Sequence, residues 1–295
     1  MRYKWLIFLL VHSVSVFGEI QLEDDFGYVL HLSGPAQRVI SLAPNITELV
    51  FASGAGEKLV GTVSYSDFPE AAKKVRQIGT SKQLSYESLV GLNPDLVLAW
   101  RSGNGSAVTN RLRSLGINVH ESEMVILEDV PRTLRNYGVL LGSARQAELK
   151  AQEFVSKLET LRERYSTRVP VSVYYQLWNE PLLTLNKEHI ISDVIRLCGG
   201  QNVFAESVAL VSRISVETVI RKDPQVIIAS GMGQVRLEWL DNWRYWSSMA
   251  AVTEDQLYFV PPDLIQRHTL RIIRGAEMLC DYLDRAREHY ERSAK

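Results

Sequence analysis

The chain contains 295 residues, of which 46% are hydrophobic and 23% are charged, and its formal net charge at pH 7 is −1. This composition is typical of a globular protein with one large domain or two smaller ones. The balanced charge excludes a global basic field of the kind that draws proteins to nucleic acid, so no nucleic-acid partner is expected.

The first residues have the order expected of a secretory signal peptide. Arg2 and Lys4 precede the apolar stretch Trp5–Val11, and the polar stretch Glu19–Asp25 follows soon after it. The apolar stretch is too short to span a membrane as a helix. Residues 1–18 are therefore predicted to be a signal peptide, and the alternative is an N-terminal helix that packs on the domain.

Only two cysteines occur, Cys198 and Cys280. Behind a signal peptide, two cysteines are typical of one disulfide bond in an oxidising compartment. Closing this loop would stabilise the second half of the chain by about 4–5 kcal/mol in the chain-entropy description. The alternative is a pair of buried free thiols.

One sequence unit occurs twice. Ser85–Ala99 (SYESLVGLNPDLVLA) and Ser215–Ala229 (SVETVIRKDPQVIIA) share Ser, Glu, Pro and the final Ala at a constant offset of 130 residues. Each copy predicts a short helix capped by its serine, a turn marked by its proline, and a buried parallel strand. Two such units far apart in the chain indicate two similar lobes.

Strand and helix patterns alternate on both sides of a long amphipathic helix. Apolar residues recur at helical spacing from Ala144 to Tyr165, with charged residues between them. Alternating strands and helices predict parallel α/β layers. The predicted fold is α/β, with two Rossmann-like lobes of parallel sheet (19–143 and 167–295) joined by one connecting helix (144–166). The alternative is a single domain with an ordinary surface helix.

Enzyme motifs are weak or missing in the sequence. Gly231-Met232-Gly233 resembles the start of a dinucleotide loop, but Arg236 stands where the third glycine belongs. The sequence has no nucleophile elbow, zinc-spaced histidine pair or phosphate loop. We therefore expect a binding protein rather than an enzyme, with no resident cofactor or metal. His268 is expected to be a loop histidine that faces solvent.

Five segments together carry a resemblance to a known family. They are Arg38–Glu48 (RVISLAPNITE), Val60–Pro69 (VGTVSYSDFP), Pro94–Trp100 (PDLVLAW), Leu197–Phe204 (LCGGQNVF) and the terminal helix with Cys280. The chain resembles the periplasmic cobalamin-binding proteins, which belong to a wider family that also binds ferric siderophores and haem. The resemblance implies two α/β lobes joined by a long helix, a ligand in the cleft between them, and a disulfide in the second lobe.

The resemblance also implies roles for individual residues. Tyr65 and Trp100 match aromatic positions that line the corrin site, and Arg267 matches a cleft arginine. Aromatic rings at strand ends offer flat apolar contact to a macrocycle, whereas the alternative for either ring is plain core packing. The family's ABC permease in the inner membrane is a dimer, and Glu87 and Glu217 would meet its two subunits. The alternative for each glutamate is compensation of a helix dipole.

Other positions depart from the family pattern. Ser81 and Val211 stand at or near positions that are tryptophan in the cobalamin binder, and Leu183 stands near a cleft phenylalanine. Four further tryptophans are candidates to replace these missing aromatic rings in the cleft: Trp178, Trp239, Trp243 and Trp246. The expected protein is a periplasmic monomer that carries cobalamin as cargo. Haem or a ferric siderophore is the alternative ligand, and a secreted ligand sensor without a transport role is a further alternative.

Overall fold

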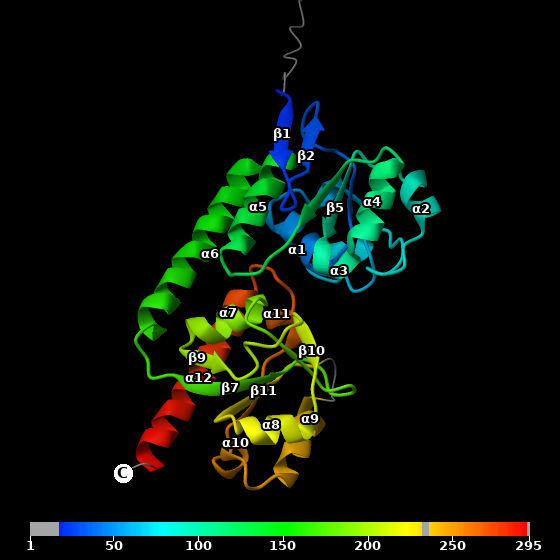
Figure 1. The fold of residues 1–295 in the computed structure, drawn as a ribbon. Coiled ribbons are helices and arrows are strands. Elements are labelled where there is room, and N and C mark those ends of the chain that lie inside the picture. The colour runs from blue at the N-terminus through cyan, green and yellow to red at the C-terminus, as the bar shows by residue number, and fades with distance from the viewer. Residues whose placement is uncertain (1–17, 232–235, 294–295) are drawn as a thin grey trace, which may run out of the picture.

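Two lobes, each built around a four-stranded parallel sheet, make up the protein (Figure 1). The computed structural model describes residues 18–231 and 236–293. Residues 1–17 of the predicted signal peptide lie outside the described residues. Among the described helices, none is both long enough and apolar enough to cross a membrane.

The first lobe carries a β-hairpin followed by alternating strands and helices. Its strands β3 and β5 are buried on both faces, as expected for parallel strands covered by helices. Its elements are β1 (Ile20–Glu23), β2 (Val29–Leu32), β3 (Val39–Ser41), α1 (Pro44–Ala52), η1 (Gly56–Lys58), β4 (Leu59–Gly61), η2 (Glu70–Lys74), α2 (Tyr86–Gly91), β5 (Leu96–Trp100), α3 (Arg101–Asn104), α4 (Ser106–Ser114), β6 (Val119–Ser122) and α5 (Asp129–Leu140).

The second lobe repeats this pattern and adds a short antiparallel ribbon of β8 and β10, which the sequence did not predict. Its elements are β7 (Val171–Gln176), β8 (Leu183–Leu185), α7 (Ile190–Leu197), β9 (Gly200–Asn202), β10 (Val211–Arg213), α8 (Val216–Lys222), β11 (Val226–Ala229), α9 (Arg236–Asp241), η4 (Asn242–Tyr245), α10 (Ala250–Thr253), β12 (Leu257–Phe259), α11 (Pro262–Ile265) and α12 (Ile272–Ser293).

The two sheets have the same topology. The strand order is β4-β3-β5-β6 in the first lobe and β9-β7-β11-β12 in the second. Counted along the chain, the second strand of each sheet lies at one edge, and the first strand lies between the second and the third. The repeated sequence unit supplies the third strand in both sheets, β5 and β11. In open sheets of this kind, ligands bind at the carboxyl ends of the strands where the order reverses.

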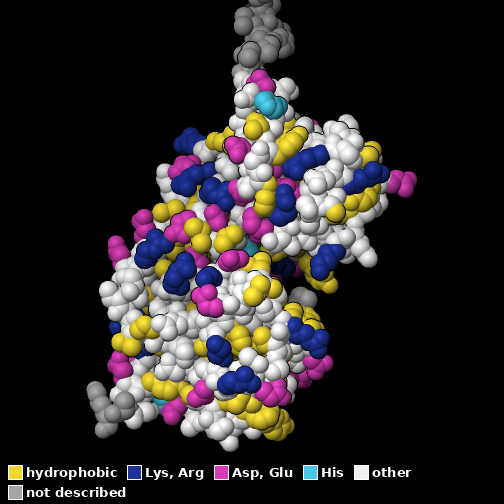
Figure 2. Space-filling view, in the orientation of Figure 1, with side chains coloured by type: hydrophobic (Ala, Val, Ile, Leu, Met, Phe, Trp, Pro, Cys, Tyr) yellow, Lys and Arg dark blue, Asp and Glu magenta, His cyan; other side chains and the backbone are white. Residues whose placement is uncertain are grey.

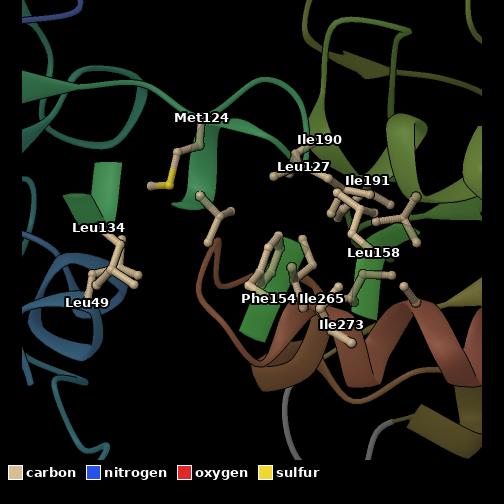
Figure 3. Packing of buried hydrophobic residues seen from close by; sticks show 14 of the residues in the cluster. Leu49, Met124, Leu127, Leu134, Phe154, Leu158, Ile190, Ile191, Ile265 and Ile273 are labelled. Atoms are coloured by element: carbon tan, nitrogen blue, oxygen red, sulfur yellow. The ribbon is translucent and has the colours of Figure 1, made fainter. Parts of the chain in front are cut away.

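Helix α6 (Ala144–Tyr165) joins the lobes, with the bounds predicted from the sequence. Figure 1 shows it running along one side of the molecule, from the first lobe to the second. Its apolar stripe, which includes Ala151, Phe154 and Leu158, is buried. These residues belong to one hydrophobic cluster that contains Leu134 of α5 as well as residues of α7 and α12 (Figure 3).

A disulfide bond joins Cys198, at the end of α7, to Cys280 in α12, which confirms the predicted pairing. Both cysteines are fully buried, and their Cα atoms lie 4.6 Å apart. The two cysteines are 82 residues apart in the chain, and the bond therefore fastens the terminal helix α12 to α7 within the second lobe.

Candidate ligand-binding cleft

A pocket of about 240 Å³ lies between the lobes, at the carboxyl ends of their parallel strands. Figure 2 shows the surface hollowed in the region where the two lobes meet. Three larger hollows lie elsewhere: one of about 690 Å³ beside α8 involves only the second lobe, and those of about 450 and 300 Å³ lie against α6. The pocket at the strand ends, called the inter-lobe pocket below, therefore fits a cleft-bound ligand better. The residues that line the inter-lobe pocket are Pro44, Asn45, Tyr65, Trp100, Pro262, Asp263, Gln266 and Arg267. The structure thus brings together the three residues that were predicted to bind ligand.

Tyr65 lies in the loop after β4 and is 67% exposed. Its backbone φ is +67°, in the left-handed region that a bulky residue rarely adopts. An exposed aromatic ring on strained backbone gains nothing from core packing, so the packing alternative does not explain this residue. Tyr65 therefore offers an open aromatic face to the pocket.

Trp100, the last residue of β5, is partly buried and held on several sides. Its indole Nε1 donates a hydrogen bond to Glu123 Oε1 at 2.8 Å, and its backbone N–H donates one to Asn104 Oδ1 at 2.8 Å. The ring of His268, from the second lobe, meets the indole edge-on with centroids 5.3 Å apart. Trp100 also packs against the central hydrophobic cluster. It is thus both a core residue and a wall of the pocket.

Arg267 follows α11 and reaches across the cleft to the first lobe. Its Nη1 donates to Asp67 Oδ1 at 2.6 Å and to Glu48 Oε1 at 3.0 Å, and its Nε lies 3.1 Å from Asp263 Oδ1. Burial lowers the pKa of Arg267, but the hydrogen bonds that it donates to Asp67 and Glu48 and the negative charge of Asp263 outweigh this effect and raise the pKa above its usual value. The cleft arginine is therefore already paired with carboxylates from both lobes.

Comparison with known proteins places this architecture in a family. A model of the periplasmic binding protein family matches residues 39–264. The chain belongs to this family. A vitamin B12-binding protein of Vibrio cholerae is 34% identical over 250 residues, which is 84% of this chain and 90% of the relative.

Solved structures of periplasmic binding proteins show the same fold. The crystal structure of the Vibrio cholerae periplasmic vitamin B12 binding protein matches with a TM-score of 0.81 and 34% identity, over 85% of this chain and 98% of that chain. A periplasmic heme-binding protein from Roseiflexus matches with a TM-score of 0.75 over 85% of this chain and 99% of that chain, but with only 22% identity. This second match supports the fold alone.

Four residues of this periplasmic binding protein matter at the cleft although the sequence did not single them out as site residues. Glu48 and Asp67 hold Arg267, Glu123 holds Trp100, and Asn45 lines the pocket. Glu48 and Asp67 do fall within the segments that carry the family resemblance. However, no local signal marked Glu48, because it lies in the second turn of α1 and its arginine partners are 219 and 223 residues away in the chain.

His268 is not the solvent-facing histidine that we expected. It is only 3% exposed and lies between the rings of Trp100 and His189, with the two imidazole centroids 5.4 Å apart. Burial lowers the pKa of His268 to about 3, so the imidazole is neutral at pH 7. The expectation was wrong because loop position says little about exposure where two lobes pack together.

The four further tryptophans divide into two pairs. Trp239 and Trp243 are buried in a hydrophobic cluster of the second lobe, where Trp243 Nε1 donates to Gln176 Oε1 at 2.7 Å. Trp178 and Trp246 are partly exposed. None of the four appears among the residues that line the inter-lobe pocket.

Glu87 and Glu217 occupy equivalent exposed positions on the two lobes, in the first turns of α2 and α8. The capping serines of the repeat do cap these helices: Ser85 Oγ accepts from Ser88 N at 3.2 Å, and Ser215 Oγ from Thr218 N at 3.4 Å. A hydrogen bond with Ser215 lowers the pKa of Glu217. Each lobe thus presents one carboxylate at the same place in its fold.

Proposed function

We propose that this protein captures cobalamin in the cleft between its lobes and delivers it to an ABC importer in the inner membrane. The observation that carries the proposal is 34% identity to a vitamin B12-binding protein over 84% of the chain. The cleft supports it, because Tyr65 and Trp100 offer the flat apolar faces that a large macrocycle needs.

The proposed activity is binding without chemistry. The mature protein is exported to the periplasm after removal of residues 1–18, works as a monomer, and releases its cargo unchanged. Cobalamin is then cargo rather than a resident cofactor. The pocket of about 240 Å³ is smaller than a corrinoid, so most of the ligand would lie over the cleft mouth, with its ring against Tyr65 and Trp100.

Delivery requires a surface that the importer recognises. We infer that Glu87 and Glu217 dock on the two subunits of a dimeric permease, one glutamate on each. Their equivalent exposed positions in two lobes of the same topology support this role. Charge pairing at such an interface steers and orients docking more than it adds affinity.

The first prediction tests the ligand. Titration of the mature protein with cyanocobalamin, haem and a ferric siderophore should show tight binding of cyanocobalamin alone. Trp100→Ala should weaken that binding by about 1–3 kcal/mol, the usual loss for a buried aromatic contact, and Trp100→Phe should lose less.

Trp246→Ala is the matched control, because Trp246 does not line the inter-lobe pocket. Calorimetric titration and thermal unfolding of each variant separate loss of affinity from loss of fold. Binding of haem or the siderophore without cyanocobalamin would overturn the ligand. Binding of cyanocobalamin with no uptake defect in a deletion strain would favour the sensor alternative.

A further inference from the structure

Five charged side chains form a cluster across the cleft. Besides the contacts of Arg267, the guanidinium of Arg271 donates two hydrogen bonds to Glu48, from Nε to Oε2 at 2.9 Å and from Nη2 to Oε1 at 2.5 Å. Glu48 comes from the first lobe, and its side chain is only 4% exposed. The cluster is completed by Asp67 and Asp263, so two arginines face three carboxylates.

The cluster leaves no uncompensated positive charge at the pocket. Arg267 is the only cation among the described residues that line the pocket, and carboxylates contact it from three positions. A hydrogen bond from Arg267 holds the pKa of Asp67 below its usual value, so this carboxylate is ionised at neutral pH. The formal charge of the five groups is −1.

The pocket also contains an unused neutral donor. Asn45 lines it and is 4% exposed, yet its Nδ2 has no hydrogen-bond partner within the described part of the chain. Buried amide groups are normally hydrogen-bonded, and an unpartnered one at a pocket wall calls for a partner from outside the protein. An N–H donor of this kind pairs well with the carbonyl oxygen of a ligand.

We propose that the cleft selects a macrocycle whose edge carries neutral carboxamides and discriminates against one whose edge carries carboxylates. This inference rests on the proposed function and narrows its ligand class. Asn45 would donate to an amide carbonyl of the ligand. A ligand carboxylate would instead meet the excess negative charge of Glu48, Asp67 and Asp263, because these three carboxylates outnumber the two arginines that they contact.

The test compares cyanocobalamin with its monocarboxylate derivatives, in which one side-chain amide is hydrolysed to a carboxylate. The wild-type protein should bind the derivative whose carboxylate faces the cluster at least about tenfold more weakly than cyanocobalamin. The double variant Asp67→Asn with Asp263→Asn changes the cluster charge from −1 to +1 and should abolish that difference. Both side chains are about half exposed, so the fold should tolerate the change.

Glu148→Gln with Glu153→Gln is the matched control, since it neutralises two exposed carboxylates on α6 that do not line the inter-lobe pocket. It should leave the tenfold difference unchanged. Asn45→Asp replaces the neutral donor with an acceptor of the same shape and should weaken cyanocobalamin binding about tenfold or more.

Two outcomes would overturn the inference: equal binding of the amide and carboxylate ligands by the wild type, or equal effects of the cleft variant and the α6 control. If no corrinoid binds, the proposed function fails. In that case, the same comparison is made between haem, which carries two carboxylates, and its dimethyl ester, which carries none. Tighter binding of haem than of the ester would overturn the proposed selection against carboxylates independently of the proposed function.

Discussion

Trp100 is positioned by residues that approach it from three directions. Glu123 accepts the hydrogen bond of its indole and also holds the following turn, because Oε2 accepts from Ser102 N at 2.9 Å. A Cβ at Gly103 would lie 2.3 Å from Trp100 Cε3, so only glycine at this position allows the indole ring to pack against the backbone. His268 meets the ring from the second lobe. The direction of the indole face is therefore fixed before ligand arrives.

A second prediction follows for Glu123 as a positioning residue. Glu123→Ala should weaken cyanocobalamin binding by about 1 kcal/mol, the worth of one hydrogen bond, and should shift the indole N–H resonance of Trp100 in the ligand-free protein. Glu123→Gln keeps a carbonyl acceptor and should restore most of the affinity. NMR of the free protein beside calorimetric titration gives both readings. An unshifted indole resonance in Glu123→Ala would contradict the positioning role.

Single residues also mark the limit of what the sequence could predict about the cleft. Tyr65, Trp100 and Arg267 were found because they fall on positions that the family resemblance marks. Glu48 and Arg271 are separated by 223 residues, and their pairing depends on how two lobes meet. No local pattern encodes such a contact, so the charge cluster became visible only in the folded chain.

At the scale of elements, the two copies of the repeat agree even in their turn residues. Asn93 and Asp223, at the same offset of 130 residues, have φ of +45° and +42° and precede the prolines of the two units. Asparagine and aspartate tolerate this left-handed backbone better than other non-glycine residues. Cap, turn and strand are all local signals, which is why α2, β5, α8 and β11 could be predicted from sequence.

The elements that sequence reasoning missed lack such local signals. The ribbon of β8 and β10 pairs two segments of three residues each, and the partners lie far apart in the chain. Such short strands carry too few residues to show alternation. The segment after Trp100 forms the single turn α3 (Arg101–Asn104), which is likewise too short to show helical periodicity in the sequence.

A third prediction belongs to the two repeated helices. Glu87→Arg with Glu217→Arg should abolish cobalamin uptake while the affinity for cyanocobalamin in solution stays unchanged. Each single reversal should give a partial loss of docking that depends on salt, because exposed charges are screened. Binding to the permease in vesicles, uptake by cells and a ligand titration measure the three quantities.

Glu70→Arg with Glu288→Arg is a control of equal charge change at exposed carboxylates outside α2 and α8, one in each lobe. It should support normal uptake. Uptake at the wild-type rate by the Glu87 and Glu217 variant would leave these glutamates with dipole compensation as their only role.

At the scale of the whole molecule, buried histidines link stability to pH. Burial lowers the pKa of His120 to about 4 and that of His268 to about 3, whereas an unfolded chain has histidine pKa values near 6.5. Between these values the unfolded state binds more protons than the native state. Stability should therefore fall as pH drops from about 6.5 towards 4, by up to about 1.4 kcal/mol per pH unit for each histidine.

This fourth prediction is checked by urea unfolding between pH 7 and pH 4. His268→Gln should flatten the dependence on pH relative to the wild type, even if it lowers the stability at pH 7. His31→Gln, at an exposed site of the hairpin, is the control and should keep the wild-type slope. An unchanged slope in His268→Gln would show that this imidazole is not the group responsible.

The hydrophobic cluster that contains Phe154 and Leu158 has a further consequence for how the molecule can be altered. It runs without interruption from Leu30 in the first lobe to Ala286 in the terminal helix (Figure 3 shows part of it). The two lobes therefore have separate sheets but share one continuous hydrophobic core. A lobe exchanged with that of a relative would have to bring matching faces of α6 and α12 with it, whereas the loops at the cleft mouth could be replaced one at a time.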